Sequence, residues 1–176
     1  IPEEKVLLAI GQFIPRKGFD VLLKAAARLD RDVGIYLVGG EATPEYVALR
    51  EELGLANVHF VGFKPKTELA EYYKAADAFV LPTREDIWGL VINEAMAYGL
   101  PVVTTDRCVA GLELVENGVN GYIVPVGDEN ALADRLRCLL SSDMSAMGRI
   151  SLKKIRNYTL ENMAKAHMDY LQEWEK

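Results

Sequence analysis

The chain has 176 residues, 50% of them apolar and 26% charged, which predicts a single globular domain over residues 1–176. Its net charge of -6 excludes the basic face that nucleic-acid binding requires, and no apolar run approaches the roughly 18 residues of a membrane-spanning helix. Two cysteines without metal-ligand spacing, and a start without the basic residues of a signal peptide, favour reduced thiols in a cytoplasmic protein.

Short apolar segments alternate with helical patterns along the chain. The segments typical of buried strands are residues 5–13, 34–40, 57–62, 77–82, 100–105 and 121–126. Apolar spacing and capping residues predict four helices between the strands, which begin after Gly18, at Thr43, near residue 69 and at Gly89 or Leu90; the third ends near residue 76. Three further helices are predicted at the end of the chain: one from Asp128 to about 140, one that follows it to about 157, and one from Thr159 to the end.

This alternation predicts the fold class. Continuous apolar strands separated by helices form parallel sheets that are covered on both faces. We therefore expect an α/β fold with a doubly wound, Rossmann-like parallel sheet of about six strands and helices on both faces. Ligands of such sheets bind beyond the carboxyl ends of the strands, so the loops of interest are residues 11–18, 38–44, 61–68 and 81–90.

The first of these loops places two cations at the start of a helix. Arg16 and Lys17 precede Gly18, where unpaired N–H groups and the helix dipole normally favour negative charge. An anion such as a diphosphate would resolve this conflict, and the alternative is a solvated basic pair. The loop has neither the Walker spacing nor a G-x-G-x-x-G, which disfavours nicotinamide binding.

The segment 81–99 is the most informative of the chain. Its helix is apolar on nearly all sides, which predicts that the helix is buried and that Glu94 lies near the buried top of the sheet. A carboxylate there needs hydrogen bonds, from sugar hydroxyls or alternatively from the backbone, Lys or Arg. Gly89 fits a closely approaching ligand, whereas Trp88 is more typical of a core residue than of a stacking platform.

Four segments in order resemble one family. LPTREDIWGLVINEAMAYGLPVVTTD resembles the P-S-x-x-E-G-F-G-L-x-x-x-E-A-M-A-x-G-x-P-V pattern of family 4 glycosyltransferases, the retaining group of the GT-B fold. GQFIPRKGFDVLLKA resembles their G-R-x-x-x-x-K-G segment, HFVGFKPKTELAEYYKAADAFVLPT their base-side loop and following strand, and ENGVNGYIVPVGD their E-x-G-x-x-G segment. This resemblance covers nearly the whole chain, and it matches the C-terminal half of the two-domain GT-B fold.

The resemblance implies a role in donor binding for particular residues. Lys17 would hold the diphosphate and Asp86 the transferred sugar, so that both stabilise the reacting groups, while Glu94 would hold the ribose. The remaining donor-binding residues that it implies are Gly11 and Arg16 beside the diphosphate, Gly62, Phe63 and Lys64 beside the base, Ile87, Trp88 and Gly89 along the sugar, and the backbone N–H groups of Leu90 and Val91 on the diphosphate.

Two departures from the family pattern leave assignments open. The first acid is Asp86 instead of a glutamate, and the adjacent Glu85 could contact the sugar in its place. Gln12 stands at the position of the family arginine, and Arg16 is the candidate to supply the lost charge from another angle.

The resemblance implies the donor-binding domain of a retaining glycosyltransferase for polysaccharide biosynthesis. It would move a sugar from a UDP-, GDP- or ADP-linked donor to a saccharide or lipid-linked acceptor, with no metal and no cofactor besides the donor substrate. The acceptor site, the general catalytic residues and any peripheral membrane association would belong to an N-terminal domain, without which this domain should transfer little sugar. The alternatives are a nucleotide-binding regulatory or interaction module and a sugar-nucleotide epimerase of the same fold.

Other polar signals are expected to be structural. Asp30 and Asp32 form an Asp-x-Asp at the wrong edge of the sheet for a metal site, and His59 and His167 are expected to be structural or solvated. Glu113 and Glu116 resemble acids of a family helix near the donor, and they are expected to support donor binding at most. The final helix carries an apolar stripe that either lacks its partner domain or packs on its own sheet; its residues are Met163, Ala166, Tyr170, Leu171 and Trp174.

Overall fold

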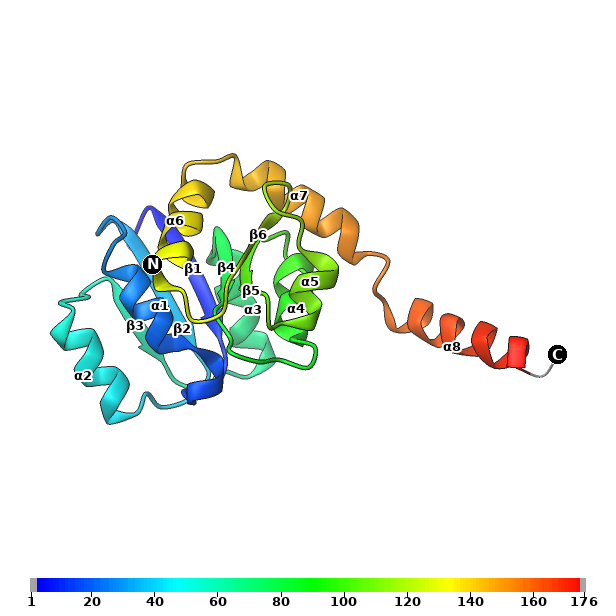
Figure 1. The fold of residues 1–176 in the computed structure, drawn as a ribbon, viewed down its shortest axis with the longest axis horizontal. Coiled ribbons are helices and arrows are strands. Elements are labelled where there is room, and N and C mark those ends of the chain that lie inside the picture. The colour runs from blue at the N-terminus through cyan, green and yellow to red at the C-terminus, as the bar shows by residue number, and fades with distance from the viewer. Residues whose placement is uncertain (1–2, 175–176) are drawn as a thin grey trace.

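The computed structural model describes residues 3–174 and forms one parallel sheet (Figure 1). Its strands are β1 (Lys5–Ile10), β2 (Val33–Val38), β3 (Val58–Val61), β4 (Ala78–Leu81), β5 (Val102–Thr105) and β6 (Gly121–Val124). They lie in the order β3-β2-β1-β4-β5-β6, and all five pairings are parallel. The order reverses beside β1, as in doubly wound sheets, so the predicted fold class is confirmed.

Helices connect the strands, and further helices follow the last strand. They are η1 (Pro15–Lys17, a 3₁₀ turn), α1 (Phe19–Ala26), α2 (Pro44–Glu52), α3 (Lys66–Ala75), α4 (Leu90–Ala97), α5 (Val109–Leu114), α6 (Glu129–Leu140), α7 (Met144–Ile155) and α8 (Leu160–Trp174). The predicted cap of α6 is confirmed, because the Asp128 carboxylate accepts hydrogen bonds from two N–H groups of its first turn. Helix α5 lies in a stretch for which the apolar pattern predicts no helix.

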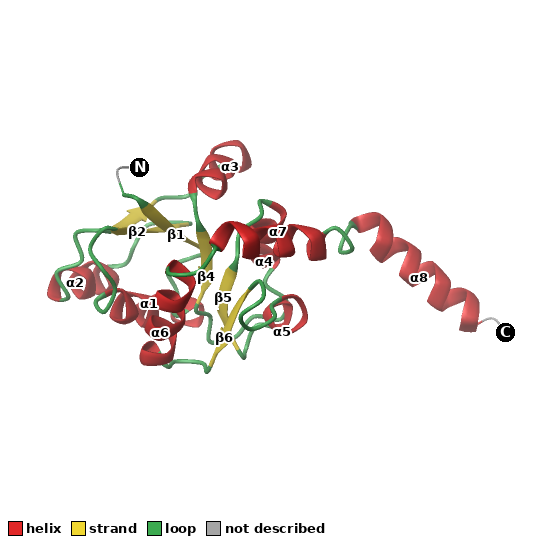
Figure 2. Cartoon of the chain, turned by 90° about the horizontal axis from the view of Figure 1, so that it is seen from above, coloured by secondary structure: helices red, strands yellow, loops and turns green. Residues whose placement is uncertain are grey.

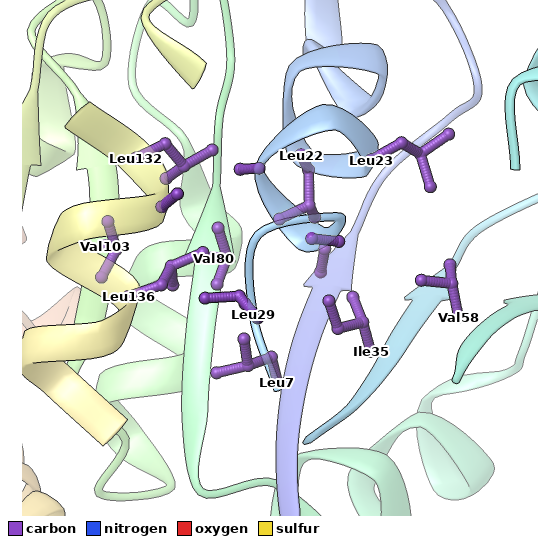
Figure 3. Close-up of a cluster of buried hydrophobic side chains, with 14 of the residues drawn as sticks. Leu7, Leu22, Leu23, Leu29, Ile35, Val58, Val80, Val103, Leu132 and Leu136 are labelled. Atoms are coloured by element: carbon purple, nitrogen blue, oxygen red, sulfur yellow. The ribbon is translucent and has the colours of Figure 1, made fainter. Parts of the chain in front are cut away.

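Both faces of the sheet are covered. Successive residues of β1 point to opposite sides, so Leu7 and Leu8 belong to different apolar clusters. The cluster containing Leu7 lies against α1, α2 and α6, and Figure 3 shows its Leu22, Ile35 and Leu136 among other side chains. The cluster containing Leu8 lies against α3, α4, α5 and α7. The two clusters fix the helices, and with them the loops at the carboxyl edge of the sheet.

Helix α8 extends away from the sheet and its covering helices (Figures 1 and 2). The Thr159 hydroxyl accepts a hydrogen bond from the N–H of Asn162, which confirms the predicted cap. Its described side chains are exposed, including the large apolar ones Leu160, Met163, Met168, Tyr170, Leu171 and Trp174. The alternative that this stripe packs on its own sheet is therefore wrong. No helix among residues 3–174 is long and apolar enough to cross a bilayer.

Candidate functional site

Lys17 and Asp86 form an ion pair at the carboxyl edge of the sheet. Lys17 ends η1 after β1, Asp86 lies in the loop after β4, and their Nζ and Oδ2 atoms are 2.6 Å apart. Each side chain is 14% exposed, so the pair is accessible but shielded. The aliphatic part of Lys17 lies over Gly11, where an added Cβ would come within 3.4 Å of it. A Cβ at this distance would make an ordinary van der Waals contact, so Gly11 packs directly against the Lys17 side chain.

Hydrogen bonds tie the two loops together. The Thr83 hydroxyl lies 2.9 Å from the Arg16 carbonyl oxygen, which also accepts the Arg84 N–H at 2.7 Å. The Arg84 guanidinium donates to both carboxylate oxygens of Asp20, at 2.8 and 2.7 Å, and to the Pro15 carbonyl. Burial acts to raise the pKa of Asp20, but the hydrogen bonds and charge of Arg84 outweigh it and lower that pKa. Together these contacts fix the loop that carries Lys17 beside the loop that carries Asp86.

Gly18 lets the two loops approach so closely. Its φ is +68°, in the left-handed region, and a Cβ there would collide with the carbonyl oxygen of Pro82. Gly18 therefore allows two things at once: the left-handed turn between η1 and α1, and the close contact of its backbone with the loop after β4.

Arg16 contacts the loop that carries Glu85 and Asp86. Arg16 donates to the Glu85 carbonyl at 3.1 Å and lies 4.0 Å from Asp86 Oδ2. The Glu85 side chain is exposed, so the acid that faces Lys17 is Asp86. Gln12 is exposed at the preceding turn.

Helix α4 begins directly after this loop. Gly89 has φ +95°, and an added Cβ would lie only 2.7 Å from the Cys108 sulfur. The N–H of Asp86 donates to the Arg107 carbonyl, and the N–H of Val109 donates to the Asp86 carbonyl, so the loop is also fixed to the start of α5. Leu90 and Val91 are the first residues of α4, and their N–H groups have no acceptor within the helix. These N–H groups point out of the start of the helix along its axis, and the positive end of the helix dipole there favours an anion.

The prediction that Glu94 is buried is wrong. Only one face of α4 is buried, through Ile92, Ala95 and Met96, whereas Leu90 is 68% exposed and Glu94 is exposed. The neighbours α5 and α7 cover that one face and leave the other open. Glu94 Oε2 accepts a hydrogen bond from the Tyr73 hydroxyl at 2.8 Å, which is neither the backbone partner nor the Lys or Arg considered above. Sequence reasoning missed Tyr73, which it placed only on the apolar face of α3.

Glu94 lines a cavity of about 250 Å³ between α3 and α4, together with Lys66, Tyr73 and Tyr98. Neither Lys17 nor Asp86 lines this cavity. The structure thus brings Lys17, Arg16 and Asp86 together, and it places Glu94 one turn along α4 in a separate hollow.

The remaining predicted residues lie on the surrounding loops. Phe63, which is 78% exposed, and Gly62 follow β3, and Lys64 pairs with Glu68 at 3.0 Å. Ile87 is 87% exposed. Trp88 is half-buried against the apolar cluster that contains Leu8, and its indole N–H donates to Asn93, so it is not a fully buried core residue.

The residues discounted above lie on the surface or contact other side chains of this chain. Asp30 and Asp32 lie between α1 and β2, at the amino edge of the sheet, and residues 3–174 contain no cluster of three metal-ligating side chains. His59 contacts Glu3 at 2.7 Å and stacks on Tyr36, while Glu113 accepts a hydrogen bond from Tyr158.

A doubly wound parallel sheet, with Lys17, Asp86 and the start of α4 at its carboxyl edge, defines a Rossmann-like α/β domain. The family model described as glycosyl transferases group 1 matches residues 4–142. The chain belongs to this family of GT-B glycosyltransferases.

Relatives and solved structures agree with this assignment. The chain is 35% identical over 169 residues to D-inositol 3-phosphate glycosyltransferase of Corynebacterium glutamicum, a match that covers 88% of this chain and 40% of the relative. HepE from Anabaena, solved in complex with UDP and glucose, superposes with a TM-score of 0.84 and 26% identity over 96% of this chain and 48% of its own. The C-terminal domain of LpcC, a group 1 glycosyl transferase from Francisella tularensis, superposes with a TM-score of 0.79 and 26% identity over 91% and 89%. The chain therefore spans about two fifths of the curated relative's length.

Proposed function

We propose that the chain is the donor-binding, C-terminal domain of a retaining glycosyltransferase that uses a nucleoside diphosphate sugar without a metal ion. The observation that carries the proposal is the Lys17–Asp86 pair, held at the carboxyl edge beside the first N–H groups of α4. The likeness to a solved C-terminal domain and to a structure in complex with UDP and glucose supports it.

In this proposal the charge of the departing diphosphate is stabilised by fixed groups of this chain. Lys17 supplies a cation and the start of α4 supplies N–H groups, both in place before the bond to the sugar breaks. Such electrostatic stabilisation of a leaving group can replace a metal ion. Arg16 lies close enough to add a second positive charge in place of the arginine that Gln12 replaces.

The other residues bind and orient the donor. Asp86 contacts the sugar, with Ile87, Trp88 and Gly89 along it, and Glu94 contacts the ribose. The loop of Gly62, Phe63 and Lys64 lies beside the base. The acceptor and the general catalytic residues belong to an N-terminal domain, which the exposed apolar face of α8 is suited to contact.

Calorimetric titration with UDP, GDP and ADP and their sugars tests the proposal. We expect one nucleotide to bind, in the presence of a metal chelator as well, and the isolated chain to transfer little sugar. Lys17→Ala should weaken binding at least about tenfold, since a charge-assisted hydrogen bond contributes roughly 1.5–3 kcal/mol. Lys74→Ala is the matched control, because Lys74 pairs with Glu71 on the surface of α3 and should not affect binding.

Two further results would decide against parts of the proposal. Binding of none of the nucleotides would favour an interaction module. An unchanged affinity of Arg16→Ala, alongside a weakened Lys17→Ala, would show that Arg16 is a bystander.

A further inference from the structure

Tyr73 supplies the one hydrogen bond that the Glu94 carboxylate accepts within residues 3–174. Its hydroxyl lies 2.8 Å from Glu94 Oε2, and its side chain, on the inner face of α3, is only 3% exposed. The bond joins two helices that the strand β4 separates in sequence. A buried donor thus reaches an exposed acceptor at the rim of the cavity between α3 and α4.

The phenol ring is held on two sides. It stacks on Tyr98 with ring centroids 5.0 Å apart and an interplanar angle of 5°, and it packs against Phe79 at 6.2 Å. A tyrosine hydroxyl is protonated at neutral pH in any case, and burial and the bond to Glu94 raise the pKa of Tyr73 further. Tyr73 is therefore a rigid and permanent donor.

A neutral donor has a particular effect on a carboxylate. A lysine or arginine in this place would neutralise the charge of Glu94, whereas a phenol fixes its orientation and leaves that charge intact. Glutamate is a flexible side chain, and holding it in one rotamer in advance lowers the entropy that a ligand must overcome. The second oxygen, Oε1, remains available to a ligand.

We propose that Tyr73 is a positioning residue that directs Glu94 toward the ribose hydroxyls and so sets a preference for ribonucleotides over deoxyribonucleotides. The inference rests on the proposed function, because it takes Glu94 as the ribose ligand. Tyr73 itself need not touch the nucleotide. Its effect is transmitted through the orientation of one carboxylate.

The test compares ribose and deoxyribose forms of one nucleotide. The probe is whichever of UDP, GDP and ADP binds most tightly, titrated alongside its 2′-deoxy and 3′-deoxy forms. We expect the unsubstituted chain to prefer the ribose form, and Tyr73→Phe to reduce that preference by about five- to tenfold. This is less than the loss of a direct hydrogen bond to a charged group would cause, because Tyr73 acts through the orientation of Glu94. Tyr72→Phe is the matched control, since it removes a hydroxyl from the next residue, whose ring faces Tyr36.

Two additional variants separate positioning from general damage to the fold. In a Glu94→Ala background, Tyr73→Phe should have no further effect on the preference, because the residue it acts through is gone. Site-specific 4-aminophenylalanine at position 73 keeps a donor on the ring and should restore the preference. Thermal melting of each variant checks that the fold is kept.

Each outcome bears on the inference. A nucleotide that binds with an undiminished ribose preference in Tyr73→Phe would overturn it and leave the donor-site proposal standing. Binding without any ribose preference in the unsubstituted chain would also overturn it. Absence of binding by all three nucleotides would overturn the donor-site proposal and this inference together.

Discussion

The Nζ atom of Lys17 lies 2.6 Å from Oδ2 of Asp86, although the two residues are 69 positions apart in the chain. The contact joins the loops after β1 and β4, which are neighbouring strands of the sheet. A cation that would otherwise be unfavourable at the start of a helix is thereby paired within the protein. In the proposed function, the same pairing sets the net charge that an incoming diphosphate would meet.

Replacement of this aspartate should change two binding properties in opposite directions. Asp86→Asn removes a negative charge beside Lys17, so a nucleoside diphosphate without sugar should bind about three- to tenfold more tightly, as expected for a close, partly screened charge. The sugar-linked form should gain less, because Asp86 is the proposed sugar contact. Calorimetry with both ligands measures the difference, and Glu85→Gln serves as control for the adjacent exposed acid. Equal gains for both ligands would remove Asp86 from the sugar site.

A methyl group at Gly18 should destabilise the fold more than one at another left-handed glycine. Gly18→Ala places a side chain at φ +68° against the Pro82 carbonyl, and we expect a loss of about 2–4 kcal/mol in the free energy of unfolding. Gly54 has a similar φ of +62° with open space around it, so Gly54→Ala should cost only about 1–2 kcal/mol. Urea denaturation compares the two, and equal losses would contradict the proposed close contact.

The Asp20–Arg84 pair should contribute to stability in a defined pH window. Because the pKa of Asp20 is lower in the folded state, its contribution is present above its unfolded pKa of about 3.9 and is lost as pH falls through the folded value. Unfolding free energies measured from neutral pH to about pH 2 should therefore fall less steeply in Asp20→Asn than in the unsubstituted chain below about pH 4.

Asp134→Asn is the matched control for this experiment. Asp134 pairs with Arg137 on the surface of α6, where the aspartate side chain is 65% exposed, so its removal should change stability by less than about 1 kcal/mol. The interpretation fails if Asp20→Asn reproduces the full acid-dependent loss.

The sheet could be predicted from the sequence because most of its strands are largely apolar runs that need cover on both faces. The ends of strands were less predictable. The first apolar run extends to Phe13, but β1 ends at Ile10, since Gly11 turns the chain toward η1 and Phe13 packs into the core from a loop. Local patterns describe which residues are buried better than which ones pair in a ladder.

The ion pair at the carboxyl edge joins two residues that the sequence singled out, but their contact was not predictable. Lys17 and Asp86 could be named from motifs, yet their pairing depends on the adjacency of β1 and β4, which no local pattern specifies. Burial of Glu94 was predicted wrongly because the composition of α4 does not reveal that its neighbours cover only one face. Tyr73 carried no signal at all, since a tyrosine on an apolar helix face is indistinguishable from ordinary core.

The fastening of the β1 and β4 loops through Thr83, Arg84 and Asp20 uses only groups from within this chain. The folding of this domain alone therefore fixes the geometry at the carboxyl edge of the sheet, without contacts to another domain. Under the proposed function, such a donor-binding unit would keep its own geometry when joined to a different acceptor-binding domain. Exchange of that domain between relatives would then change the acceptor while the donor site stays the same.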